Sequence, residues 1–218
     1  MPKHLKVVLL TVVLLASVLP AAAAATPTFY NNRAAFQAAL SSSFTDDYEN
    51  PAYQFIQNDA QMTAVNHETR YMSTGFSNLD IVFNDQGNNH SYCAGCNGSF
   101  ELFFDNTTFG GSNGVFGVGL DVVDVNDGYT AYITFGDNTT MNVLLPSAGS
   151  FFGVTDTTGI KSICFGLPNC GTTTSLSFAM DNLTIGSGGT TTPEPSTLLT
   201  FGSGLFAVAG VLRRKLRE

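Results

Sequence analysis

The sequence predicts an all-β protein, built as a single antiparallel β-sandwich of two sheets in a jelly-roll-like arrangement. Of its 218 residues, 44% are hydrophobic and only 12% are charged, whereas charged residues make up about a quarter of an average soluble protein. Glycine, serine, threonine and asparagine are abundant, and the helix-forming glutamate, lysine and arginine are scarce. Short apolar segments alternate with turn residues from residue 26 to residue 185. This combination excludes a coiled coil, a helical bundle and an intrinsically disordered chain.

The first 25 residues predict a secretory signal peptide. Lys3 and Lys6 precede an apolar run over residues 7–19, and Pro20 leads into small residues that end at Ala25. This is the three-part layout of a signal peptide, and we expect cleavage after Ala25. An uncleaved N-terminal anchor is the alternative, although the apolar run is short for a permanent membrane span.

The domain over residues 26–185 begins with the one helix that the sequence predicts. Asn32 is placed to cap this helix, and an apolar stripe from Ala35 to Leu40 follows at helical spacing. The rest of the domain predicts short strands separated by turn residues, without alternating helices, which favours a two-sheet sandwich. We expect nine strands, at Phe44–Tyr48, Leu79–Phe83, Ser99–Phe104, Val115–Val123, Tyr129–Phe135, Thr140–Leu145, Phe151–Val154, Ile160–Phe165 and Ser175–Ile185.

All four cysteines lie in the domain that we expect outside the cytoplasm, where disulfides form. Four cysteines allow three pairings. We favour Cys93–Cys96 and Cys164–Cys170, each of which would close a small loop and add modest stability. A four-cysteine zinc site is the alternative, because Cys93 and Cys96 have a zinc-like spacing, although the other two cysteines lie too far apart for a usual zinc knuckle.

Charge is distributed unevenly along the chain. Residues 26–192 contain three basic residues, Arg33, Arg70 and Lys161, against 15 acidic residues, which gives this segment a formal net charge of −12. Such a segment repels phosphate backbones and anionic lipid headgroups, so we expect no nucleic-acid partner. The charge suits a protein that stays soluble outside the cell or one that binds cations.

Two acidic positions resemble the calcium marks of carbohydrate-binding jelly rolls. In those modules, Phe-x-x-x-x-Glu early in the domain and an aspartate near its end accompany a structural Ca²⁺ ion between the first and last strands. Here Phe44 with Glu49, and Asp181 with Asn182, stand in the corresponding places. The resemblance implies Glu49 and Asp181 as calcium ligands, because Ca²⁺ takes several oxygen ligands. Alternatively, these residues cap turns, with Asp181 accepting backbone N–H groups.

The sequence offers little catalytic machinery. Once the signal peptide is removed, only His67 and His90 remain, His90 is expected in a loop, and no Gly-x-Ser-x-Gly motif accompanies them. A glycosidase needs two carboxylates at a controlled separation. Any acidic sandwich supplies such pairs by chance, here among Asp46, Asp47, Glu49, Asp121, Asp124, Asp127 and Asp181. We therefore expect that the protein is not an enzyme.

The C-terminal residues predict a linker followed by a short membrane helix. Residues 186–192 form a Gly/Thr-rich linker, and Pro193, Glu194 and Pro195 follow it. The 17 residues from Ser196 to Leu212 carry no charge. As a helix they would span about 26 Å, slightly less than the roughly 30 Å hydrocarbon core of a bilayer. Four basic residues close the chain and should stay cytoplasmic: Arg213, Arg214, Lys215 and Arg217.

This tail resembles the PEP-CTERM sorting signal in its three parts and in their order. The resemblance implies a Gram-negative bacterium that produces extracellular polysaccharide. It also implies an exosortase, which recognises the tail in the inner membrane and removes it, so that the protein is delivered to the cell surface or the exopolymer matrix. An ordinary tail anchor is the alternative.

We therefore expect an exported, non-enzymatic surface or exopolymer-matrix protein. A calcium-stabilised carbohydrate-binding module is the alternative, because sugar-binding faces combine exposed aromatic side chains with amides. The tyrosines available for such a face are Tyr48, Tyr53, Tyr71, Tyr92 and Tyr129. Exposed, clustered tyrosines would favour the carbohydrate-binding module. Two carboxylates facing each other in a cleft would favour a second alternative, a secreted hydrolase.

Overall fold

The computed structural model describes residues 26–87, 89–125, 129–167, 170–171 and 177–188. The predicted signal peptide and the predicted tail, with its helix at 196–212, lie outside these residues. Within the described ranges, no helix has both the length and the apolar character needed to cross a membrane.

The described part of the chain contains thirteen β-strands and two α-helices. Its first half consists of β1 (Thr28–Tyr30), α2 (Arg33–Ala38), β2 (Leu40–Asp46), β3 (Ile56–Gln57), α3 (Asp59–Asn66), β4 (Arg70–Ser73), a 3₁₀ turn (Phe76–Asn78), β5 (Asp80–Gln86), β6 (Asn89–Ala94) and β7 (Phe100–Phe103). Its second half consists of β8 (Gly110–Gly111), β9 (Gly114–Val125), β10 (Thr130–Phe135), β11 (Thr140–Leu144), β12 (Ser150–Gly166) and β13 (Phe178–Gly188). The prediction of a mostly β chain is confirmed.

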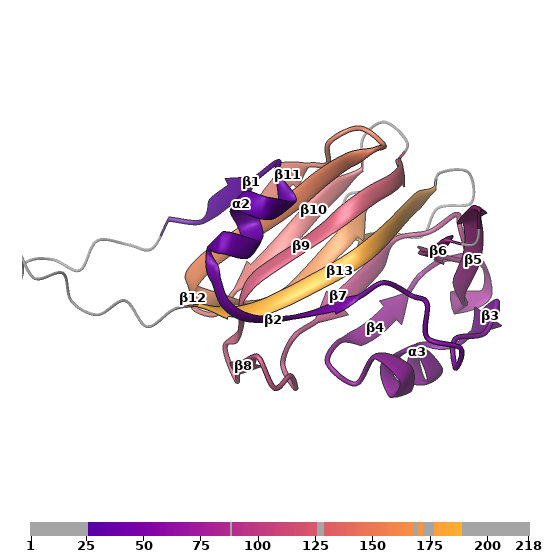
Figure 1. Cartoon of the computed structure of the whole chain (residues 1–218), viewed down its shortest axis with the longest axis horizontal. Coiled ribbons are helices and arrows are strands. Elements are labelled where there is room, and N and C mark those ends of the chain that lie inside the picture. Colours follow the sequence, from indigo (N-terminus) through magenta and orange to yellow (C-terminus); the bar gives the residue numbers. More distant parts are fainter. Residues whose placement is uncertain (1–25, 88, 126–128, 168–169, 172–176, 189–218) are drawn as a thin grey trace, which may run out of the picture.

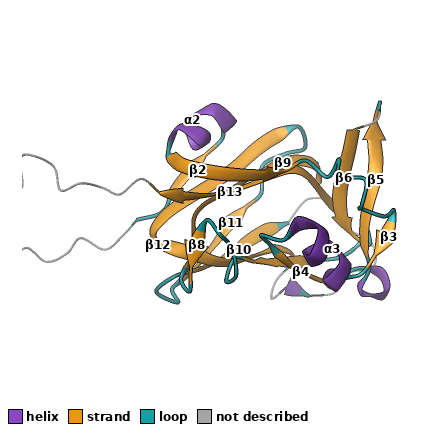
Figure 2. Cartoon of the chain, turned by 60° about the horizontal axis from the view of Figure 1, so that its bottom comes forward, coloured by secondary structure: helices purple, strands orange, loops and turns teal. Residues whose placement is uncertain are grey.

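All thirteen strands belong to one antiparallel sheet, so the predicted division into two sheets is not confirmed. The main path runs β11-β10-β12-β9-β13-β6-β5-β3, and the remaining strands pair with members of this path or with each other. β12 makes the sheet continuous, because Ser150–Thr155 pairs with β9 whereas Ile160–Gly166 pairs with β10. The predicted strands at 151–154 and 160–165 are therefore two parts of one 17-residue strand, which bends between them (Figures 1 and 2).

The bend in β12 brings its two parts together across the core. The ring centroids of Phe152, in the first part, and Phe165, in the second, lie 6.1 Å apart. Phe165 also lies 5.4 Å from Phe100 of β7 and 5.4 Å from Phe178 of β13. Each fully buried phenylalanine stabilises the fold by roughly 1.5–3 kcal/mol. The apolar faces of strands that are distant along the sheet thus share one aromatic core.

α2 is the helix that the sequence predicts, and Asn32 caps it as expected. The Asn32 side-chain oxygen accepts a hydrogen bond from the backbone N–H of Ala35 over 3.0 Å. The helix buries Phe36 against β9 and β12 at positions occupied by glycine. A Cβ atom on Gly119 would lie 2.8 Å from the Phe36 ring, and one on Gly153 would lie 3.1 Å from it. Glycine in these strands therefore permits a close helix–sheet approach.

The sequence does not predict α3, β4 or β6, which lie together at one end of the molecule (Figure 1). α3 begins with a capping box between Asn58 and Gln61, and it buries the side chain of Met62. β6 forms a hairpin with β5 in which His90 lies opposite Asn84. The expectation that His90 lies in a loop is therefore wrong. The polar start of β6 lacks the apolar alternation that predicts a strand.

Both favoured disulfides are present, Cys93–Cys96 and Cys164–Cys170. They use all four cysteines, so the alternative of a four-cysteine zinc site does not hold. The first closes the turn after β6, and the second ties the end of β12 to the residues that lead to β13. For loops this short, the reduction in unfolded-state entropy predicts about 2 kcal/mol of stabilisation from each disulfide.

The bend in β12 requires glycine at position 159. Gly159 has a φ of +96°, and a Cβ atom there would lie 2.4 Å from the backbone oxygen of Asn113. We expect Gly159→Ala to lower the free energy of unfolding by at least about 2 kcal/mol, because backbone strain and a clash act together. Urea unfolding followed by circular dichroism measures the change. Gly149→Ala is the matched control, because Gly149 has a φ of +78° and no atom within 4 Å of the added Cβ. Equal losses in the two variants would contradict this account of the bend.

Candidate functional site

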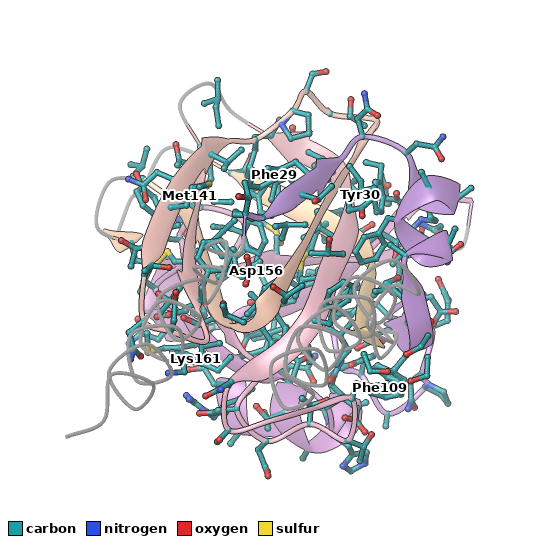
Figure 3. The ribbon with its side chains drawn as sticks, turned by 90° about the vertical axis from the view of Figure 1, so that its left-hand side faces the viewer. Phe29, Tyr30, Phe109, Met141, Asp156 and Lys161 are labelled. Carbon is teal, nitrogen blue, oxygen red and sulfur yellow. A yellow bond between two sulfur atoms is a disulfide. The ribbon has the colours of Figure 1, made fainter. Side chains whose placement is uncertain are left out.

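The two ends of the described domain lie at the same end of the sheet. Thr28 pairs with Thr155, Thr155 with Gly117, and Gly117 with Gly186, so these residues form one row across four strands. At about 4.8 Å between neighbouring strands, Thr28 and Gly186 are about 14 Å apart. Figure 3 looks onto this end of the molecule, with Phe29 and Tyr30 of β1 near its upper part. The segments that precede and follow the domain therefore attach to one pole, which we call the attachment pole.

β13 carries the chain to the attachment pole between two hydrogen-bonded neighbours. β2 pairs with it from Leu183 to Gly188, and β9 pairs with it as far as Gly186. The hydroxyl oxygens of Ser42 and Ser187 lie 2.6 Å apart and add a side-chain link between β2 and β13. The strand thus occupies the first three residues of the predicted linker 186–192. The described chain therefore ends in a strand that lies in the interior of the sheet.

Arg33 of α2 organises a polar cluster on β9 and β13. Its guanidinium lies 2.9 Å from the carboxylate of Asp121 and donates to the Asn182 carbonyl and the Thr184 hydroxyl. The Asn182 amide donates to Asp121 and to Asp181, over 3.0 Å in each case. Asn182 has a φ of +51° and lies at a register shift between β13 and β9. The cluster fixes α2 on the sheet through groups that satisfy one another.

The structure places the two predicted calcium ligands in different hydrogen-bonded groups. Asp181 accepts hydrogen bonds from the Asn89 side chain and from the Asn182 backbone, as the capped-turn alternative expects. Glu49 instead accepts two hydrogen bonds from His90. Burial raises the pKa of Asp181. Among the described residues, no group of three or more His, Cys, Asp or Glu side chains is arranged to hold a metal ion.

Calcium binding stays a prediction that a melting experiment decides. A ligand that binds only the folded state stabilises it by RT ln(1 + [L]/Kd), which is about 2.7 kcal/mol at a hundred times Kd. A structural Ca²⁺ ion would therefore raise the melting temperature by several degrees over that in EGTA. From the separate partners of Glu49 and Asp181, we expect equal melting temperatures in the two buffers. A clear increase with Ca²⁺ that Asp181→Asn abolishes would restore the calcium hypothesis.

Most of the tyrosines proposed for a sugar-binding face lie in the core, so that expectation is wrong for them. Tyr48, Tyr71, Tyr92 and Tyr129 are buried, and only Tyr53 is partly exposed. The Tyr48 and Tyr71 hydroxyls lie 3.1 Å apart, and the Tyr92 ring stacks on Tyr48 at 5.8 Å between centroids. Tyr48, Tyr71 and Tyr92 pack against one another, and Tyr129 packs on Phe178, so none of these four rings faces solvent.

A small pocket that the sequence does not predict lies between the loop after β2 and the β5–β6 hairpin. We call it the Phe55 pocket, and its volume is about 270 Å³. It is lined by Tyr48, Glu49, Asn50, Pro51, Tyr53, Phe55, Val82, Asn84 and His90. The two Glu49 oxygens accept hydrogen bonds from the backbone N–H and the ring Nδ1 of His90, over 2.6 and 2.7 Å. These bonds lower the pKa of Glu49 and fix both side chains at the pocket wall.

A second, larger groove contains carboxylates that bear on the hydrolase alternative. It has a volume of about 920 Å³, and its lining includes Asp85, Asp121 and Arg33. A glycosidase requires one carboxyl that is kept protonated in the cleft. The carboxyls whose pKa burial raises, Asp46, Asp80 and Asp181, do not line this groove. Within the groove, the Asp121 carboxylate forms an ion pair with Arg33 over 2.9 Å.

Asp80 of β5 is a buried acid within the fold. It is fully buried, and its Oδ1 accepts a hydrogen bond of 2.6 Å from the Tyr92 hydroxyl. Its Oδ2 has no hydrogen-bond partner among the described residues. Burial raises the pKa of Asp80 to about 8, and the nearby Asp59 carboxylate adds to the shift. The protonated form is therefore the one that the fold favours.

We expect Asp80 to make the protein less stable as pH rises. The pKa is about 8 in the fold and about 3.9 in the unfolded chain, so its favourable contribution is complete below about pH 4 and is lost as pH rises toward 8. The loss approaches 1.4 kcal/mol per pH unit. Asp80→Asn should remove this slope from urea unfolding measured between pH 5 and 8. Asp137→Asn, at an exposed turn, is the control and should leave the slope unchanged. A slope that persists in Asp80→Asn would contradict the assignment.

Comparison with known proteins identifies the tail rather than the domain. Residues 191–215 match the family model of the PEP-CTERM protein-sorting motif. The match includes Pro193, Glu194 and Pro195 and the first three residues of the basic cluster, Arg213, Arg214 and Lys215, whereas Arg217 follows it. These residues lie outside the described structure. Searches of curated proteins and of solved structures found no match for the chain.

Proposed function

Because the chain carries a PEP-CTERM protein-sorting motif at residues 191–215, we propose that it is an exported, non-enzymatic protein of the cell surface or exopolymer matrix. The motif implies export, membrane-associated sorting and processing by an exosortase. The proposal adds that the domain is the cargo which the tail delivers, and that its role outside the cell is structural or adhesive. The match to the motif is the observation that carries this proposal.

The sequence at both ends supports the same orientation. Lys3 and Lys6 at one end and the basic cluster from Arg213 to Arg217 at the other should both stay on the cytoplasmic side. The acidic domain between them is then outside the cytoplasm. The row of paired residues from Thr28 to Gly186 fits this orientation, because both flanking segments leave from the attachment pole.

The disulfides and the charge of the domain support a location outside the cell. Two disulfides use every cysteine, which fits an oxidising compartment. The three basic side chains of the domain are each engaged, Arg33 with Asp121, Arg70 with Asp105 and Lys161 with the Asn138 side chain. The excess negative charge favours solubility and weakens attraction to anionic lipids and polymers.

The Phe55 pocket supports the carbohydrate-binding alternative. The sequence predicts that alternative from exposed tyrosines and from a calcium site, and neither feature adds support. The tyrosines are mostly buried, and the predicted calcium ligands have separate partners. The secreted hydrolase has less support, since Asp121 in the larger groove is already engaged in an ion pair with Arg33. We therefore retain the surface or matrix protein as the main proposal.

The tail is the part of the chain through which this proposal is tested. The full chain is produced in a bacterium that contains an exosortase, and its mass and location are measured after membrane fractionation. We expect a product that lacks the tail and is found at the surface or in the medium. Replacing Pro193, Glu194 and Pro195 with alanine should leave the tail in place and hold the chain in the inner membrane. Glu218→Ala, outside the matched motif, is the control. Unchanged processing of the triple variant would overturn the proposal.

A further inference from the structure

We propose that the Phe55 pocket binds a single uncharged sugar ring. This inference rests on the proposed function, because it names what a surface or matrix protein would hold outside the cell. The pocket combines an exposed aromatic ring, a fixed carboxylate–histidine pair and amide side chains within about 270 Å³.

The floor of the pocket is one face of the β5–β6 hairpin. Asn84 of β5 pairs with His90 of β6, and partners in an antiparallel pair point to the same face. Val82 lies two residues before Asn84, so it shares that face and supplies an apolar base. The hydrogen-bonded hairpin gives these side chains fixed positions, which a specific site requires.

The wall of the pocket is the loop after β2, which side-chain hydrogen bonds hold in shape. The Asp47 carboxylate accepts from the backbone N–H of Glu49 over 3.1 Å, and the Asn50 side chain accepts from that of Ala52 over 3.0 Å. The Tyr53 hydroxyl donates to Asp46, which anchors the end of the loop in the core. Short turns closed by Asp and Asn side chains preorganise a loop, which lowers the entropy lost on binding.

Phe55 supplies a platform for the apolar face of a sugar ring. Its side chain is 64% exposed although it lines the pocket. Its backbone oxygen accepts a hydrogen bond of 3.3 Å from the N–H of Val82, so the residue is held against the edge of β5. Sugar rings have C–H faces that pack on aromatic rings, while their hydroxyls need polar partners at the rim. Phe55 beside Asn84 and His90 provides both kinds of contact.

The Glu49–His90 pair supplies hydrogen-bonding groups for hydroxyls. His90 uses its Nδ1 for Glu49, so its Nε2 is the ring nitrogen left to meet a ligand. Each Glu49 oxygen accepts one hydrogen bond from His90 and retains capacity for another. A hydroxyl can both donate to Glu49 and accept from, or donate to, the imidazole. The pair therefore suits vicinal hydroxyls of one ring.

Charge and size select an uncharged, single ring. Arg33, Arg70 and Lys161 do not line the pocket, and the described surface is strongly acidic, so sulfated, phosphorylated or uronic sugars are disfavoured. The volume of about 270 Å³ falls below the roughly 300–1,000 Å³ of sites for drug-sized ligands. One ring of a longer chain would enter, and the neighbouring rings would remain in solvent. In Figure 1, β3, β5 and β6 lie at the end of the molecule opposite the attachment pole.

The test uses the full chain in a detergent without a sugar headgroup. The probes are the methyl glycosides of glucose, galactose, mannose and N-acetylglucosamine, and the measurement is saturation-transfer NMR with titration to millimolar concentration. We expect saturation of the ring protons of at least one glycoside. Phe55→Ala and His90→Ala should each weaken its binding about tenfold, because each removes one of the few direct contacts. Phe76→Ala is the matched control, because Phe76 is 65% exposed and lies outside the pocket.

Two outcomes would overturn the inference. The first is that none of the four glycosides receives saturation from the wild-type chain. The second is that Phe76→Ala weakens binding as much as Phe55→Ala, which would indicate nonspecific contact with exposed aromatic rings. Matching melting temperatures for the three phenylalanine and histidine variants exclude unfolding as the cause. Failure of this test with normal tail processing overturns only the sugar site, whereas failure of processing overturns the proposed function whatever the glycosides do.

Discussion

The bend of β12 is the constraint on which the rest of the structure depends. One strand of 17 residues pairs with β9 before the bend and with β10 and β7 after it, so a single sheet closes over a core. Without the change of direction near Gly159, Phe152 and Phe165 would not meet, and the aromatic core they share with Phe178 would be open to water. One backbone conformation thus decides how apolar surface from distant strands is buried.

The part of β12 before the bend sets the positions of the chain ends. The first part of β12 lies between β1 and β9, and β9 in turn lies beside β13, which places Thr28 and Gly186 in one row. Both ends of the domain therefore leave from one pole, while the β5–β6 hairpin and α3 lie at the other (Figure 1). The fold separates the part of the chain that is attached from the part that is free to meet a partner.

The sequence predicts structural features that depend on neighbouring residues in the chain. It does not predict features that depend on contacts between residues far apart in the chain. β10 alternates apolar and polar residues within six positions, and the cap of α2 lies beside its helix, so both are predictable. β6 begins with polar residues and becomes a strand by pairing with β5 and β13, which are distant from each other in the sequence. Tyr48 is buried because three other tyrosines and Phe100 surround this part of the core, which its local sequence does not indicate. The Phe55 pocket depends on Glu49 and His90, which are 41 positions apart.

The same difference explains why the tail can be identified from the sequence whereas the pocket of the domain cannot. A sorting signal is recognised as a short stretch of chain, so its proline pair, apolar run and basic cluster stand next to one another and can be identified without a fold. A binding pocket needs side chains that are held in fixed positions relative to one another. In the Phe55 pocket, turns capped by side chains hold the loop after β2, and backbone pairing holds the β5–β6 hairpin. Because the tail match covers residues 191–215 alone, it places no constraint on what the domain binds. The chemistry of the domain depends on its own side chains, and among the pockets described the Phe55 pocket is the one that places an exposed aromatic ring beside a fixed carboxylate–histidine pair.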